Sequence, residues 1–123
     1  MKALLLDVKN GIVKEVNANG LHDYYRLIGC DCIDIVNREI NGKRFDIICD
    51  DEGLLKENVQ ISAIDTKGYP MLVGNLIIAG KADTEGELTD LSESDVIFLK
   101  GNVKRIPTRN YPEGILMMCN VAY

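Results

Sequence analysis

The feature that most constrains this chain is a hairpin signal near its middle. Two β-rich runs, residues 32–40 and 43–50, flank the dipeptide Asn41-Gly42. Because Asn and Gly both tolerate positive φ, this dipeptide favours a two-residue type I′ turn between antiparallel strands. Such a turn fixes the register by pairing residue 40 with residue 43. The predicted pairs put charges near the tip and aliphatic side chains near the base: Glu39 with Arg44, Arg38 with Phe45, Val36 with Ile47, and Ile35 with Ile48.

Shorter signals place further strands around this hairpin, whose apolar base predicts a sheet covered on both faces. Residues 2–7 and 11–17 predict an opening hairpin, with Asn10-Gly11 as a second type I′ turn. Residues 71–79 predict a strand that bends at Gly74. Two further segments carry weaker signals: residues 115–122, a final strand, and residues 60–65, a strand or a helix.

Two short helices complete the prediction. An apolar stripe over residues 21–28 predicts a helix that Asn19 caps and that ends at Gly29. A second helix is predicted after a cap at Thr89 or Ser92. The chain of 123 residues, 46% of them hydrophobic, suits a single domain over residues 1–123. Five or six strands and two helices without βαβ alternation predict an α+β fold with a mostly antiparallel sheet.

Neither the cysteines nor the acidic turn predicts a metal site or a cofactor. Cys30-Asp31-Cys32 lacks the two-residue spacer of common zinc ligand pairs. Cys49 and Cys119 follow apolar runs, where a free thiol is typical of a small buried side chain. The three neighbouring acids Asp50-Asp51-Glu52 lack the alternation of a calcium loop and indicate a solvated turn.

No catalytic motif is present, so we expect a protein that is not an enzyme. His22 stands without a nearby nucleophile, and Tyr24-Tyr25 lies on the apolar stripe of a predicted helix, where core packing is expected. Free thiols predict a cytoplasmic protein. No apolar run has the length of a membrane span, and Asp7 ends the first apolar stretch too early for a signal peptide.

The distribution of charge suggests a partner. The net charge is −5, from 14 Lys and Arg against 19 Asp and Glu, which argues against direct nucleic-acid binding. Six acids, with no base among them, lie close together: Asp83, Glu85, Glu87, Asp90, Glu93 and Asp95. A basic stretch follows: Lys100, Lys104, Arg105 and Arg109. The acids fit either a solvated loop before a helix N-terminus or a face that docks on a basic partner.

Four blocks of the sequence, residues 27–36, 45–55, 71–78 and 88–90, resemble a family of small proteins classed as a domain of unknown function. The most specific parts are Asp50-Asp51-Glu52-Gly53-Leu54 and Val73-Gly74-Asn75, and the resemblance covers about residues 1–100. Members of this family are carried by bacterial phages, plasmids and conjugative elements. The resemblance implies an accessory protein of a mobile element, in the cytoplasm of the bacterial host, such as an anti-CRISPR or anti-restriction protein.

Two functions are therefore expected. The first is a non-enzymatic protein that binds and inhibits or modulates a host protein, plausible targets being nucleic-acid-binding nucleases of a defence system. It would use the six acids above and the hairpin tip at Asn41. The alternative is a binder of a small, nucleotide-like signal, in which the four basic residues meet phosphate groups in an oligomer. Either function is compatible with a homodimer.

Overall fold

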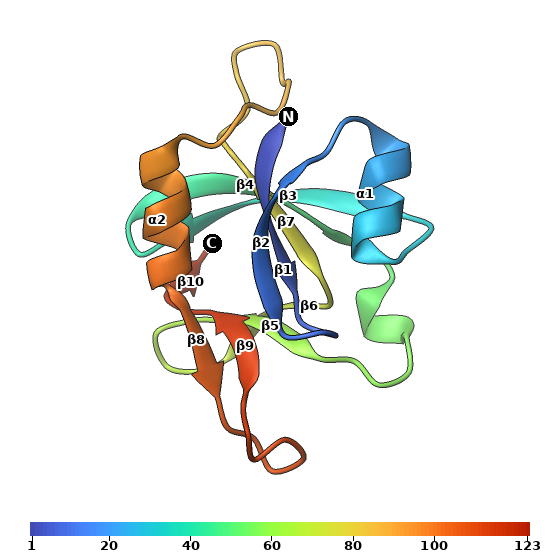
Figure 1. Ribbon diagram of the computed structural model, residues 1–123, viewed down its shortest axis with the longest axis vertical. Helices are drawn as coiled ribbons and strands as arrows, with labels where there is room; N and C mark the ends of the chain where they lie inside the picture. The colour runs from blue at the N-terminus through green and yellow to red at the C-terminus, as the bar shows by residue number, and fades with distance from the viewer.

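The computed structural model describes residues 1–123 and contains two helices and ten short strands (Figure 1). The larger sheet has the order β10-β3-β4-β7-β1-β2. Its strands are β1 (Lys2–Asp7), β2 (Ile12–Asn17), β3 (Ile33–Ile40), β4 (Lys43–Asp50), β7 (Leu76–Ala79) and β10 (Val121–Ala122). The smaller sheet has the order β6-β5-β9-β8, from β5 (Ile61–Ile64), β6 (Pro70–Val73), β8 (Val103–Ile106) and β9 (Ile115–Met118). The α+β prediction is confirmed, with a six-stranded antiparallel sheet and a second sheet that was not predicted.

The central hairpin forms as predicted. Asn41 and Gly42 have φ angles of 46° and 90°, and residue 40 pairs with residue 43. The predicted register holds along the whole of β3 and β4, including Val36 opposite Ile47. Strand β4 is the more buried partner, and β7 pairs with its other edge.

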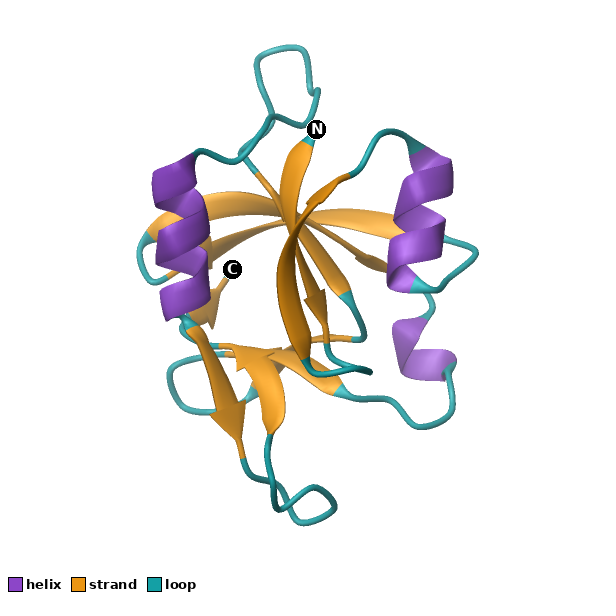
Figure 2. Cartoon of the chain, viewed as in Figure 1, coloured by secondary structure: helices purple, strands orange, loops and turns teal.

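The larger sheet is covered on both faces, as the apolar base of the hairpin predicted. Helix α1 (Leu21–Ile28) covers one face, and helix α2 (Glu93–Gly101) lies on the opposite side (Figure 2). Neighbouring side chains of β4 illustrate the division. Ile47 packs into the larger core with α2 and the smaller sheet, whereas Ile48 packs into the smaller core beneath α1. Tyr24 and Tyr25 pack against that smaller core, as their place on the apolar stripe predicted.

Two local predictions were wrong in detail. The opening hairpin has a four-residue turn, because Asp7 pairs with Ile12 and only Gly11 in the turn has positive φ. The Asp7 carboxylate accepts hydrogen bonds from the backbone N and Nδ2 of Asn10 at 3.1 and 2.8 Å, which holds this wider turn. The cap of α1 is Gly20 rather than Asn19, and the Asp23 carboxylate accepts instead from the backbone N of residue 19.

Two predicted strands are each divided between sheets. Residues 71–79 form β6 and β7, because Gly74 takes a φ of 75° and the chain changes sheet there. The final segment divides into β9 and β10 at Asn120, which has a φ of 60°. The undecided segment 60–65 contains strand β5.

Candidate functional site

Residues 81–88 leave the larger sheet as a protruding loop between β7 and α2, and we call this segment the acidic loop (Figure 1). Its neck is closed by an antiparallel bridge between Gly80 and Thr89. The Thr89 hydroxyl also donates to the carbonyl oxygen of Lys81 at 2.8 Å. A Cβ atom at Gly80 would lie 2.4 Å from the Thr89 Oγ1 atom, so the close approach requires glycine.

The base of the acidic loop is attached to the central hairpin through Asp46. This side chain is buried, and its Oδ2 accepts a 2.6 Å hydrogen bond from the backbone N of Ala82. Its Oδ1 accepts from Asn37 Nδ2 at 2.9 Å, and Arg44 donates to the Asn37 side chain at 2.8 Å. Asp46 is not among the residues predicted from the sequence, although a carboxylate within the apolar run of residues 45–49 was a signal that a buried partner is required.

Within the acidic loop, the Asp83 carboxylate faces inward. Its Oδ1 accepts hydrogen bonds from the backbone N atoms of Glu85 and Glu87 at 2.9 and 3.0 Å. Gly86 follows with a φ of 80°, which a tight turn requires at that position. The carboxylates of Glu85 and Glu87 are exposed and make no hydrogen bond or ion pair, so the loop presents two uncompensated negative charges.

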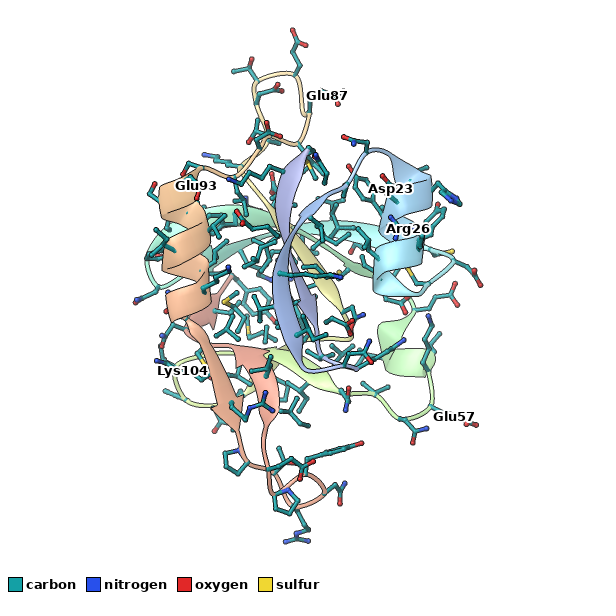
Figure 3. The ribbon with its side chains drawn as sticks, viewed as in Figure 1. Asp23, Arg26, Glu57, Glu87, Glu93 and Lys104 are labelled. Carbon is teal, nitrogen blue, oxygen red and sulfur yellow. The ribbon has the colours of Figure 1, made fainter.

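The other three predicted acids lie at or before the start of α2 and are engaged in contacts. Asp90 accepts a 2.9 Å hydrogen bond from the backbone N of Lys2. Glu93 forms an ion pair with the Lys2 side chain, which lowers the pKa of the Glu93 carboxyl (Figure 3). Asp95 forms an ion pair with Lys43.

The hairpin tip lies near the start of α2 rather than at the end of the acidic loop. The link is the ion pair of Asp95 with Lys43, which is separated from Asn41 by one residue. Asn41 is exposed, and its backbone N donates to the carbonyl oxygen of Asn120 at 2.9 Å. The predicted acidic face therefore consists of two parts. One is the exposed acidic loop, and the other is the start of α2, where the carboxylates already have partners.

The four predicted basic residues do not converge. Lys100 is in the last turn of α2, and Lys104 and Arg105 are neighbours on β8, so their side chains point to opposite sides of the strand. Arg105 donates to the carbonyl oxygen of Gly114 at 3.2 Å, and Arg109 lies in the loop after β8. The structure does not gather these cations into one phosphate site.

The two most specific parts of the family resemblance, residues 50–54 and 73–75, meet beside η1, a short 3-10 helix at Gly53–Leu55. A Cβ atom at Gly53 would lie 2.9 Å from Val73, so the turn packs closely on β6. The buried Asn75 accepts from the backbone N of Val8 at 3.0 Å. Leu54 and Leu55 are 80% and 83% exposed beside an apolar hollow of about 260 Å³.

Replacing Leu54 and Leu55 by serine is expected to change the free energy of unfolding by less than about 0.5 kcal/mol, because neither side chain is buried in the folded chain. The matched change Leu4→Ala removes a fully buried side chain and is expected to cost about 2–5 kcal/mol. Urea unfolding of the three proteins measures both effects. A large loss of stability in the serine variant would show that η1 is not exposed in solution.

The cysteines differ in burial, and no group of three or more His, Cys, Asp or Glu side chains gathers as metal ligands would. Cys30 and Cys49 are buried and Cys32 is exposed, and all four thiols are free. Burial raises the pKa of the Cys49 thiol to about 11, and the nearby Asp34 carboxylate acts in the same direction.

The raised pKa of Cys49 predicts that stability falls as the pH rises from about 9 to about 11. In this range the thiol ionises in the unfolded chain while it stays protonated in the folded chain, so the unfolded state gains stability. Urea unfolding at several pH values should show a shallower decline for Cys49→Ala than for the wild type. Equal slopes for the two proteins would contradict this assignment.

A protein-family model matches most of the chain. The model of the family described as Domain of unknown function (DUF3846) matches residues 1–104. No curated protein and no solved structure matches the chain. Beyond the matched residues, Met118 of β9 and Val121 of β10 are buried in the larger core, so this tail is part of the fold. Neither helix combines the length and the apolar character that crossing a bilayer requires.

Proposed function

We propose that this chain, which belongs to the family of the domain of unknown function DUF3846, is a non-enzymatic protein that binds and inhibits a host protein. In this proposal a mobile genetic element encodes it, and it acts in the cytoplasm of a bacterial host. Its target is a nucleic-acid-binding protein, such as a nuclease of a defence system. Binding is stoichiometric and uses the acidic loop.

The observation that carries this proposal is the contrast between the two exposed carboxylates and the rest of the acidic segment. Asp83 accepts two backbone hydrogen bonds within the loop, and the Gly80–Thr89 bridge closes its neck. Glu85 and Glu87 are left without partners at its exposed end. A loop that internal hydrogen bonds already order loses less conformational entropy when it binds, and its uncompensated charge favours recognition of a basic surface.

The charge also suggests how inhibition would work. A protein that binds nucleic acid presents clustered Lys and Arg side chains to phosphate groups. The carboxylates of Glu85 and Glu87 can pair with such side chains and occupy the site in place of phosphates. Attraction between the loop and this surface also raises the association rate and makes it sensitive to salt. Glu93 and Asp95 contribute less, because Lys2 and Lys43 already compensate their charges.

The experiment that tests this proposal is affinity capture from a host-type lysate that contains candidate defence nucleases. Two tagged baits are compared, the wild type and a variant with Glu57→Lys and Glu113→Lys, which changes two exposed glutamates outside the loop. Both baits are expected to retain the same nucleic-acid-binding protein in stoichiometric amount and to release it in high salt. If the wild-type bait retains no nucleic-acid-binding protein, the proposal is overturned.

A further inference from the structure

A hollow of about 410 Å³ opens beside the acidic loop, on the side of Glu87. Its walls come from five parts of the chain: the loop itself, the first residue, the segment that leads into α1, α1 and β3. The lining includes Met1, Tyr24, Ile35, Glu87 and Leu88. Glu87 is labelled in Figure 3, where it lies on the loop that protrudes at the top of the view.

The lining of this hollow combines apolar side chains with polar groups, and one negative charge stands at its wall. Glu87 is the only charged side chain that lines it, and Glu85 does not line it. Ile35 is 47% exposed although it belongs to a strand, and Tyr24 and Leu88 are half-buried. The terminal amino group of Met1 donates to the side chains of Asn17 and Asn19, so it is engaged elsewhere than at Glu87.

An occupant that complements this hollow has a long apolar stem and a cationic end. An arginine side chain has both, because its methylene groups cover apolar surface while its guanidinium stays polar. A guanidinium can also bind a carboxylate through two parallel hydrogen bonds and stack on an aromatic ring. Glu87 offers the carboxylate, and Tyr24 offers the ring.

We infer that the hollow between the acidic loop and α1 receives one arginine side chain of the partner protein, with its guanidinium on Glu87 and its stem against Ile35. This inference rests on the proposed function, because it names the group on the partner that the acidic loop recognises. It assigns different roles to the two free glutamates. Glu85 attracts the basic surface at a distance, whereas Glu87 makes the specific contact.

A small probe tests the hollow without the partner. N-acetyl-arginine amide is titrated into isotope-labelled protein, with the uncharged isostere N-acetyl-citrulline amide as the control. We expect saturable NMR shifts of Tyr24, Ile35 and residues 86–88 with the arginine probe only, at a Kd on the order of 1 mM. Equal shifts with the citrulline probe, or shifts confined to other surfaces, would overturn the inference.

Matched substitutions in the same loop sharpen the test. Glu87→Gln is expected to weaken binding of the arginine probe by about tenfold, because it removes a charge-assisted contact. Glu85→Gln is expected to leave it within about twofold, since its charge is exposed to water and screened. Ile35→Ala is expected to weaken it without affecting the preference for arginine over citrulline. Equal effects of the two glutamine variants would contradict the assignment of Glu87.

The outcomes separate this inference from the proposed function. Binding of the arginine probe at the hollow, with no partner captured from the lysate, would support an arginine site in the hollow and overturn the proposed function. Capture of a partner that depends equally on Glu85 and Glu87, with no binding of the probe, would support the proposed function and overturn the hollow.

Discussion

Replacing Glu85 and Glu87 together by lysine is expected to weaken binding of the captured partner by about 100-fold, or about 2.8 kcal/mol at about 1.4 kcal/mol per tenfold. The substitutions reverse the only two carboxylates of the acidic loop that lack partners, and they place cations against a basic surface. Both side chains are exposed, so the free energy of unfolding is expected to change by less than about 0.5 kcal/mol.

Titration calorimetry at low and high salt measures this effect, with the Glu57→Lys and Glu113→Lys variant as the control of equal net charge. The control is expected to bind within about threefold of the wild type, since its changes lie outside the loop and are screened by salt. The difference between the two variants should shrink as the salt concentration rises. If both variants lose affinity equally, net charge rather than the acidic loop governs binding.

Replacing Asp46 by alanine is expected to destabilise the chain by about 2–3 kcal/mol and to loosen the acidic loop. The change leaves the backbone N of Ala82 and the side chain of Asn37 without their buried acceptor. A buried donor without a partner is costly because it has lost its hydration without gaining a hydrogen bond. The loop then keeps its neck bridge but loses its attachment to β4.

Urea unfolding and hydrogen exchange at the Ala82 amide measure the two parts of this prediction. Asp65→Ala is the matched control, because Asp65 also accepts two backbone hydrogen bonds, from Lys67 and Tyr69, but in an exposed turn. The control is expected to cost about 1 kcal/mol and to leave exchange at Ala82 unchanged. Slow exchange at Ala82 in the Asp46 variant would show that other contacts hold the loop.

The central hairpin could be predicted because the residues that determine it are close together in the sequence. Asn41-Gly42 defines the turn, and a two-residue turn determines every cross-strand pair up to Ile35 with Ile48. The second sheet could not be predicted in the same way. Its four strands have four residues each, too few to establish a period, and they pair across long separations such as Ala63 with Met118.

The sequence predicted which segment carries the acids but not which of the acids lack partners. The reason is again that the deciding contacts are between residues far apart in the chain. The sequence indicates six nearby acids, but which of them are free depends on partners far along the chain. Lys2 reaches Glu93 across 91 positions, and Lys43 reaches Asp95 across 52. The support that Asp46 gives to Ala82 spans 36 positions. The folded structure shows that, of the six acids, only Glu85 and Glu87 lack partners.

The most direct test of the central claim is a competition between this chain and nucleic acid for the captured partner. Fluorescence anisotropy of a labelled oligonucleotide bound to the partner reports displacement as the chain is added. The account predicts that one equivalent of wild type displaces the oligonucleotide and that the variant with Glu85→Lys and Glu87→Lys does not. An oligonucleotide that stays bound while the wild type saturates the partner would contradict the account.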